Sequence, residues 1–267
     1  MRPAPFLIAG ILNITPDSFL DGGRYLDPDL ALARASAMLE QGAHIIDLGG
    51  ESTRPFSQRV DTHEELHRIM PVLEKILENH AQVNISIDTY KARVADVCLQ
   101  GGALIINDIS ACRFDPELIH VLAEHQPGYV LMHSRGRPET MQVNPVYDDV
   151  VLEIKQFFEE RLNFLIGSGL KENRIVLDPG IGFGKTLNHN LEILKRIREF
   201  SDFGLPLYIG LSHKSLWDKM FGLDAEQRGT ITQVGTALAA SAGVSIHRVH
   251  DPGAATRTLE TVSQICC

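Results

Sequence analysis

The fold is decided by a stretch in which two apolar runs flank one amphipathic segment: HIIDLGG (44–50), THEELHRIMPVLEKILEN (62–79) and NISIDT (84–89). Each run is short and almost continuously apolar, which is typical of a parallel strand buried on both faces. The segment between the runs has the mixed apolar and charged pattern of a surface helix. A strand, a helix and a second strand in this order predict a βαβ unit with parallel strands.

The same alternation extends along the whole chain. Six further runs of this kind, again separated by amphipathic stretches, are FLIAGILNI (6–14), LIINDIS (104–110), YVLMHS (129–134), RIVLDPG (174–180), LYIGLS (207–212) and SIHRVH (245–250). A (β/α)₈ barrel needs about 250 residues, and the chain has 267. We therefore expect one α/β domain over residues 1–267, a (β/α)₈ TIM barrel, with a doubly wound open sheet as the alternative.

Two details of residues 62–79 lead to further predictions. Thr62 and Glu65 have the spacing of a capping box, so we expect the helix to begin at this pair. Pro71 lies inside the helical pattern. Because proline lacks a backbone N–H and its ring clashes with the preceding turn, we expect the helix to be kinked or split there.

Composition limits the classes of function. Hydrophobic residues make up 44% and charged residues 22% of the chain, as in soluble globular proteins. The formal net charge of −9 argues against nucleic acid or an anionic membrane as the main partner. No apolar run reaches the roughly 20 residues of a membrane span. The N-terminal sequence MRPAPFLIAGILNIT is better explained by a buried first strand than by a signal peptide.

The four cysteines form no C-x-x-C pair, and two of them, Cys266 and Cys267, end the chain. This spacing predicts neither a zinc site nor a disulfide framework. A reducing cytoplasm is the simplest location for such a protein.

Polar residues stand where each apolar run ends: Asn13, Asp47 and Glu51, Asp88, Asn107 and Asp108, His133, Asp178, Ser212 and Lys214, and Arg248 and His250. In a barrel these ends meet at one face, where such enzymes place their chemistry. The alternative is that Asp and Asn simply favour turns. That alternative explains less well why every run ends in this way.

Two motifs point to other sites but fit them poorly. Residues 63–67, HEELH, match the zinc pattern H-E-x-x-H, but they fall in the first turn of the expected helix, so a solvated helix start is the better interpretation. Residues 180–186, GIGFGKT, resemble a phosphate-binding loop. Pro179 stands where that loop requires its first glycine, which leaves a glycine-rich turn after a strand.

Three segments together identify a resemblance: NITPDSF (13–19) followed by DGG (21–23), DLGGESTRP (47–55) and DPGIGFGK (178–185). With SIDT (86–89), ND (107–108), GLSHKS (210–215) and RVHD (248–251), they occur in the order found in bacterial dihydropteroate synthases. From about residue 6 to its end the chain closely resembles this family of pterin-binding barrels. The family's transferases join p-aminobenzoate to 6-hydroxymethyl-7,8-dihydropterin diphosphate in the folate pathway, release diphosphate and are targets of sulfonamides.

The resemblance implies a Mg²⁺ cofactor, with Asn13 as the metal ligand. It assigns the diphosphate to Asn13, Thr53, Arg54, Arg248 and His250. Cations and Mg²⁺ suit this task, because diphosphate leaves readily only when its charge is neutralised. Mg²⁺ keeps phosphate oxygens and water as ligands, so one protein ligand is plausible.

For the pterin, the resemblance implies a pocket lined by Asp88, Asn107, Asp178, Phe183 and Lys214. Carboxylates accept hydrogen bonds from the amino group and ring N–H of a pterin, and an amide both donates and accepts. The p-aminobenzoate site is implied to comprise Phe19, Asp21, Thr53, Pro55, Lys214 and Ser215.

We expect catalysis to depend on Asp88, Lys214 and Asn13. Our hypothesis is a largely dissociative substitution, in which diphosphate leaves, a pterin cation forms and the arylamine attacks it. Asp88 would favour the cation electrostatically. The expected partners are these small-molecule substrates and a second copy of the chain in a homodimer.

Four positions depart from the family's usual pattern: Leu20, Phe56, His213 and Pro252. Three other functions stay open. A methyltetrahydrofolate methyltransferase barrel would share the pterin residues but needs no diphosphate ligands. A catalytically silent pterin-binding paralogue is a second alternative, because Phe56 stands where the family normally has glycine. An unrelated phosphosugar isomerase or aldolase would use a Schiff-base lysine, which Lys214 could imitate.

Overall fold

A computed structural model describes residues 6–15, 27–53, 57–224 and 226–266. Its core is a sheet of eight parallel strands. The strands are β1 (Leu7–Asn13), β2 (Ile45–Gly49), β3 (Asn84–Asp88), β4 (Ile105–Asp108), β5 (Gly128–Met132), β6 (Ile175–Asp178), β7 (Tyr208–Gly210) and β8 (Ile246–Val249).

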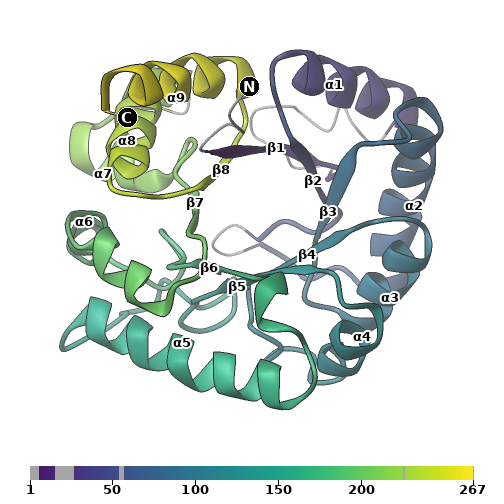
Figure 1. The fold of residues 1–267 in the computed structure, drawn as a ribbon, viewed down its shortest axis with the longest axis horizontal. Helices are drawn as coiled ribbons and strands as arrows, with labels where there is room; N and C mark the ends of the chain where they lie inside the picture. Colours follow the sequence, from purple (N-terminus) through teal and green to yellow (C-terminus); the bar gives the residue numbers. More distant parts are fainter. Residues whose placement is uncertain (1–5, 16–26, 54–56, 225, 267) are drawn as a thin grey trace.

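The order of the strands makes the sheet a barrel. Hydrogen-bonded neighbours follow the sequence from β1 to β6, and β8 pairs with both β1 and β7. A parallel bridge between Leu177 and Leu207 joins β6 to β7. The strands therefore form a ring, seen end-on in Figure 1. The predicted (β/α)₈ barrel is confirmed.

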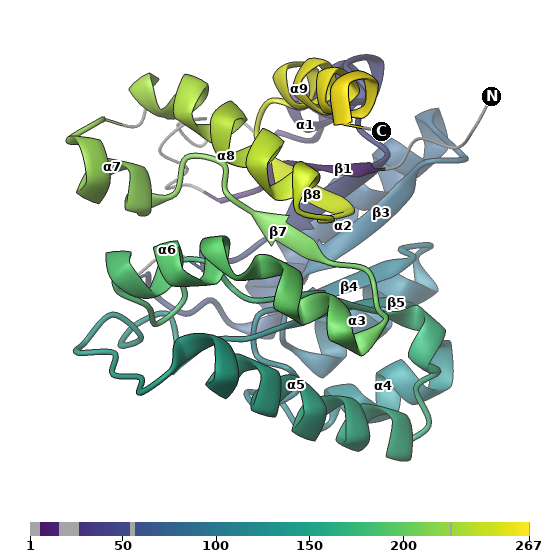
Figure 2. The same cartoon turned by 60° about the vertical axis from the view of Figure 1, so that its left-hand side comes forward.

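Helices surround this ring (Figures 1 and 2). They are α1 (Pro28–Glu40), α2 (Thr62–Asn79), α3 (Ala92–Gln100), α4 (Leu118–His125), α5 (Val150–Gly167), α6 (Leu187–Lys195), α7 (Ser215–Phe221), α8 (Gly229–Ser241) and α9 (Pro252–Cys266). Short 3₁₀ turns are η2 (Glu172–Arg174), η3 (Ile197–Phe203) and η4 (Glu226–Arg228). Among the described residues, no helix has the length and apolar character needed to cross a membrane.

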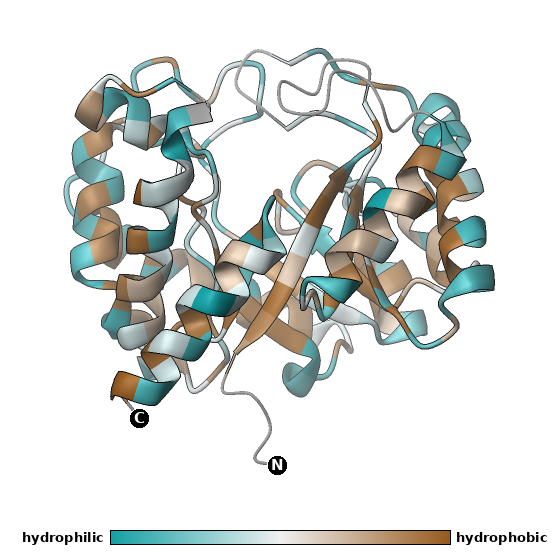
Figure 3. Cartoon of the chain, turned by 90° about the horizontal axis from the view of Figure 1, so that it is seen from above, coloured by the Kyte–Doolittle hydropathy of each residue, from teal (hydrophilic) through white to brown (hydrophobic). Residues whose placement is uncertain are grey.

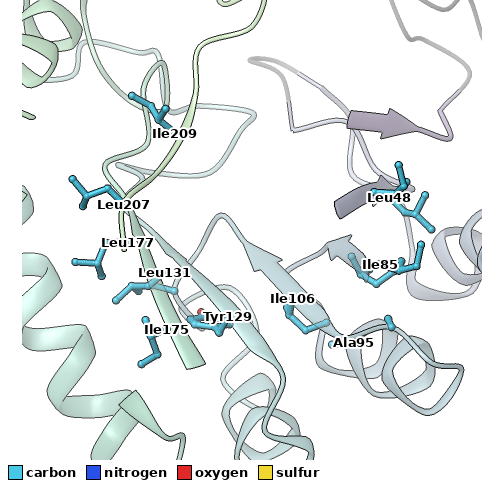
Figure 4. Close-up of a cluster of buried hydrophobic side chains, with 14 of the residues drawn as sticks. Leu48, Ile85, Ala95, Ile106, Tyr129, Leu131, Ile175, Leu177, Leu207 and Ile209 are labelled. Carbon is cyan, nitrogen blue, oxygen red and sulfur yellow. The ribbon is translucent and has the colours of Figure 1, made fainter. Parts of the chain in front are cut away.

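The largest apolar cluster lies between the strands and the helices. Leu48, Ile85 and Ile106 project from successive strands, and Ala95 of α3 packs in the same cluster (Figure 4). Along the helices that surround the barrel, brown apolar residues alternate with teal polar ones (Figure 3). This is the pattern of helices with one buried face.

A second apolar cluster fills the lower part of the barrel: Ala9, Ile45, Val130, Tyr208 and Ile246. Side chains of a strand alternate between its two faces, so the residue two positions further along also points inward. Beyond this plug some of those positions are polar: Asp47 follows Ile45, and Arg248 follows Ile246. The apolar plug thus forms the base on which a polar layer rests.

The predicted capping box at the start of α2 is wrong. Asp61 caps the helix, and its Oδ1 accepts a hydrogen bond of 2.9 Å from the Glu64 backbone N–H. Aspartate caps helices at least as well as threonine, and Asp61 has the extended backbone that a cap requires. Glu65 is instead buried and pairs with Lys91.

Pro71 does not split α2, which runs from Thr62 to Asn79. The proline ring lies on the exposed side of the helix, while Ile69, Val72 and Leu73 are buried against the barrel. Packing of the buried face on both sides of Pro71 explains how the helix continues past the missing hydrogen bond.

Candidate active site

The register of the strands brings the polar strand ends to one level. Asp88 of β3 lies opposite Asn107 of β4, and Gly49 lies opposite Asp88. Across the β7–β8 pair, Gly210 lies opposite Arg248. The predicted convergence of these side chains at the carboxyl ends of the strands is therefore what the structure shows.

A network of ion pairs and hydrogen bonds connects four of these residues, Asp47, Asp88, Asn107 and Arg248. The Arg248 guanidinium donates from Nε to Asp47 at 2.6 Å and from Nη2 to Asp88 at 2.8 Å. Asn107 donates from Nδ2 to the same Asp47 oxygen at 3.2 Å. Because a carboxylate only accepts, this bond directs the amide oxygen of Asn107 away from Asp47. Asp47 thus positions both partners from behind the pocket.

Burial changes the protonation equilibria of the pocket. Desolvation raises the pKa of Asp88 to about 7, although Arg248 opposes the shift. Desolvation likewise raises the pKa of Asp178 to about 6 and lowers that of Lys214 to about 8. Perturbed groups gathered in one cavity are a common mark of a functional site.

The turn after β6 forms one wall of the pocket and depends on glycine. Gly180, Gly182 and Gly184 all have positive φ angles, which glycine adopts without strain. The buried Lys185 side chain lies beneath the turn, and its Nζ donates to the carbonyl oxygens of Gly180 and Phe183 at 2.9 and 3.0 Å. The resemblance of this segment to a phosphate loop is therefore superficial, because its lysine holds its own backbone.

His133 also supports the turn after β6, through its contact with Lys185. Its Nδ1 lies 2.9 Å from the Lys185 Nζ, and burial lowers its pKa well below the usual value for histidine. It does not line the pocket among the described residues.

The inner pocket contains the full set of residues expected to bind a pterin. Its lining is Thr53, Asp88, Asn107, Ile109, Met132, Asp178, Gly180, Ile181, Phe183, Gly210, Lys214 and Arg248. The Lys214 ammonium lies 4.3 Å from the centre of the Phe183 ring. Sequence reasoning missed Ile109 and Met132. A usable signal was their position at the carboxyl ends of β4 and β5.

A wider cavity of about 570 Å³ opens above this pocket and shares Thr53, Asp88 and Lys214 with it. Its wall also includes Asn13, Ser215, Glu51 and His250, among others. The structure thus brings together every predicted site residue that it describes. Four predicted residues lie outside the described part of the chain: Phe19, Asp21, Arg54 and Pro55.

Of the four departures from the family pattern, Leu20 and Phe56 also lie outside the described residues. His213 adopts a positive φ of 53° and stacks edge-on against the His250 ring at 5.3 Å. Pro252 is the first residue of α9, where the lack of a backbone N–H costs nothing. His213 thus lies in the wall of the site, and Pro252 is accommodated at the start of α9.

The site offers few ligands for a metal ion. The described residues contain no group of three His, Cys, Asp or Glu side chains arranged to bind one. Asn13 and Asp88 both lie beside Gly49: a Cβ at Gly49 would lie 3.4 Å from Asn13 Oδ1 and 3.9 Å from Asp88 Oδ2. One amide oxygen beside an open space fits Mg²⁺, which retains water and phosphate ligands.

Comparison with known proteins agrees with this geometry. The family model described as "Pterin binding enzyme" matches residues 9–250. The dihydropteroate synthase of Synechocystis sp. is 41% identical over 97% of this chain and 87% of its own length.

Two solved structures are similar throughout. The Yersinia pestis dihydropteroate synthase in complex with a sulfonamide drug has a TM-score of 0.94 at 39% identity, covering 97% of this chain and 94% of its own. The Xanthomonas albilineans enzyme with 4-aminobenzoic acid has a TM-score of 0.90 at 36% identity, covering 97% and 93%.

Proposed function

This chain belongs to the family of pterin-binding enzymes, and on that premise we propose that it is a dihydropteroate synthase. It condenses 6-hydroxymethyl-7,8-dihydropterin diphosphate with p-aminobenzoate to give 7,8-dihydropteroate and diphosphate. The observation that carries the proposal is a buried floor of acids and an amide beneath a cationic rim, all at the carboxyl ends of the strands. A pterin supplies hydrogen-bond donors that match the acids and the amide of the floor. A diphosphate supplies negative charge that matches the cations of the rim.

The pterin binds over Asp88, Asn107, Asp178, Phe183 and Lys214. In this structure Asp88 has one buried oxygen without a hydrogen-bond partner among the described residues. An unpaired buried acceptor is costly, and an N–H donor of the pterin would satisfy it. The amide oxygen of Asn107 faces away from Asp47 and can accept a second such donor.

Asp88 and Lys214 carry the chemistry of the pterin. As diphosphate leaves the exocyclic methylene, positive charge develops on the ring, and the Asp88 carboxylate stabilises it in a site shielded from water. Lys214 contributes an ammonium beside Phe183 and shares the pocket with Arg248. The arylamine then attacks the methylene carbon, so no covalent enzyme intermediate is required.

The leaving diphosphate is held by Asn13, Thr53, Arg54, Arg248 and His250. Asn13 would hold Mg²⁺, and the ion would supply further neutralisation of the leaving group. The His250 ring is oriented by Ser212, whose Oγ lies 2.9 Å from His250 Nδ1. Arg248 serves both parts of the site, because it pairs with Asp88 on the pterin floor and would also contact the diphosphate.

The p-aminobenzoate occupies the wider cavity, which Thr53, Lys214 and Ser215 line. Phe19, Asp21 and Pro55, which lie outside the described residues, complete the proposed set of p-aminobenzoate ligands. Thr53 lies in both the inner pocket and the wider cavity. It is therefore suited to hold the arylamine and the pterin in contact. Positioning of two reactants in this way removes much of the entropic barrier.

Three broader features complete the proposal. Residues 1–267 form one domain, the enzyme acts in the cytoplasm, and two copies associate as a homodimer. The apolar residues exposed on α7, α8 and α9 support the last of these.

The test is incubation of the purified protein with the pterin diphosphate, p-aminobenzoate and Mg²⁺, with dihydropteroate measured by chromatography. Methyltetrahydrofolate and a corrinoid acceptor, and borohydride trapping of a carbonyl substrate, serve as assays for the rival functions. Product only in the first assay supports the proposal. Absence of dihydropteroate there, with turnover in a rival assay, contradicts it.

A further inference from the structure

Glu51 is a buried carboxylate two residues before Thr53. It is not among the residues proposed to bind the pterin or the diphosphate. Only 6% of its surface is exposed. Its Oε2 accepts a hydrogen bond of 3.0 Å from the backbone N–H of Val60, nine residues further on. Its Oε1 accepts one of 2.9 Å from the hydroxyl of Tyr90. One side chain thus ties together the two ends of the segment 51–60.

This carboxylate is itself held from two directions. Lys91, at the start of α3, donates to Glu51 Oε2 at 2.5 Å, and it also pairs with Glu65 of α2. Lys91 and Glu65 are both buried. Glu65 is the central acid of the HEELH motif, whose two histidines are exposed on the other side of the helix. The motif therefore supplies a structural anchor.

The segment is joined a second time at its base. The Ser57 hydroxyl donates to the backbone carbonyl of Ser52 at 2.5 Å. Thr53 follows Ser52 directly and lines both the inner pocket and the wider cavity. Any shift in the base of this segment would therefore move Thr53 relative to the floor of the barrel.

The chemistry of Glu51 suits this position better than that of other residues. It receives three donors: the Val60 N–H, the Tyr90 hydroxyl and the Lys91 ammonium. A carboxylate offers only acceptors, on two oxygens, whereas glutamine offers one oxygen and a donating amide. Because hydrogen bonds to charged groups are the stronger ones, the carboxylate fixes this base more firmly than a neutral group would.

We propose that Glu51 is a positioning residue that closes the base of the Thr53 segment and so sets the p-aminobenzoate side of the site. The inference rests on the proposed function for its substrate, but the closure itself is a property of the fold. It acts through Thr53 and leaves the pterin floor, which β3, β4 and β6 provide, unchanged.

The test uses two variants and one control. Glu51→Ala removes all three bonds, whereas Glu51→Gln keeps one acceptor and can donate to the Tyr90 oxygen. Glu65→Gln removes a charge from the same cluster but leaves every bond of Glu51 in place. For each protein, thermal unfolding establishes that the chain is folded.

The first measurement is the rate of tryptic cleavage at the Arg59–Val60 bond, followed by mass spectrometry. Arg59 is exposed, and the N–H of this bond is the one that Glu51 binds. Cleavage should accelerate by at least about tenfold in Glu51→Ala, less in Glu51→Gln and little in Glu65→Gln. Equal rates in Glu51→Ala and the unaltered chain would overturn the closure.

The second measurement separates the two substrates. Glu51→Ala should lower kcat/KM for p-aminobenzoate by about tenfold or more, while the Kd of 6-hydroxymethylpterin changes by less than about threefold. Glu51→Gln should recover part of the loss, and equal losses for both ligands would overturn the positioning role. If Glu51→Ala does not fold, Glu51→Gln decides by the same two criteria. Failure of the unaltered chain to form dihydropteroate would contradict the proposed function alone, because the cleavage assay needs no turnover.

Discussion

At the scale of single residues, Asp88 joins the two tasks of the site. It lies in the floor, its pKa is raised to about 7 by burial, and one of its oxygens bonds to Arg248. A carboxylate in this setting can bind the neutral pterin and favour the cation that forms as diphosphate leaves. These two tasks respond differently to the loss of charge.

Asp88→Asn tests that distinction. We expect kcat to fall on the order of 10² to 10³, because the amide cannot stabilise the developing cation. The Kd of the pterin should rise by only about tenfold or less, because the amide oxygen still accepts a hydrogen bond. Steady-state kinetics and titration calorimetry measure the two quantities. An equal loss in both would assign Asp88 to binding alone.

The pH dependence of kcat/KM follows from the same groups. The Asp88 carboxylate must be ionised, so activity should rise as the pH increases through about 7. The Lys214 ammonium must be protonated, so activity should fall as the pH increases past about 8. The profile should therefore be bell-shaped, with limbs that belong to the free enzyme. In Asp88→Asn the acidic limb should move toward about 6, the pKa of Asp178. A flat profile between pH 6 and 9, on the order of these pKa values, would contradict this assignment.

Sequence reasoning predicted the identities of these residues but not how they support one another. The bond between Arg248 and Asp47 joins residues 201 positions apart. It forms because β8 and β2 both pair with β1 when the barrel closes. No local pattern contains this information.

At the scale of elements, the turn after β6 shows how backbone geometry shapes the pocket. Gly180 and Gly204 have nearly equal φ angles of 69° and 68°. A Cβ at Gly180 would overlap the carbonyl oxygen of His133, whereas a Cβ at Gly204 would meet nothing within 4 Å. The two positions therefore separate backbone strain from steric overlap.

Gly204→Ala should lower the free energy of unfolding by about 1–2 kcal/mol, the usual penalty for a left-handed alanine. Gly180→Ala should lower it by about 1–3 kcal/mol more, because the turn and β5 must also move apart. It should in addition weaken pterin binding, since Gly180 lines the inner pocket. Urea unfolding monitored by circular dichroism, with the pterin Kd, gives both values. Equal destabilisation by the two substitutions would remove the steric argument.

Sequence periodicity predicted every strand and most helices, because both faces of each strand and one face of each helix are buried. It was wrong at the start of α2, where Asp61 and Thr62 are adjacent and both can cap a helix. It also could not show that packing would carry α2 past Pro71. Both errors arise where tertiary contacts decide between local options.

At the scale of the whole molecule, large apolar side chains are exposed on several elements, among them the three helices α7, α8 and α9. Phe221 of α7, Val234 and Leu238 of α8 and Ile265 of α9 have 50%, 48%, 68% and 77% of their surfaces exposed. The contacts between α8 and α9 place Val234, Leu238 and Ile265 on neighbouring helices. Apolar residues gathered in this way are typical of an interface.

Leu238→Asp should therefore convert the proposed dimer into a monomer, because a carboxylate would be buried at the proposed apolar interface. Leu152→Asp on α5 is the matched control. Leu152 is likewise an exposed leucine, with 51% of its surface accessible, but α5 lies on another side of the barrel. Light scattering coupled to size exclusion measures the mass. A monomeric unaltered chain, or a dimer that persists in Leu238→Asp, would contradict this interface.

The central claim is that one pocket couples loss of diphosphate to capture of the pterin by p-aminobenzoate. Dihydropteroate and diphosphate should be measured together in one reaction containing both substrates and Mg²⁺. We predict that the two products form in equal amounts when both substrates are present. Formation of diphosphate without dihydropteroate in that reaction, or no release at all, would contradict the account.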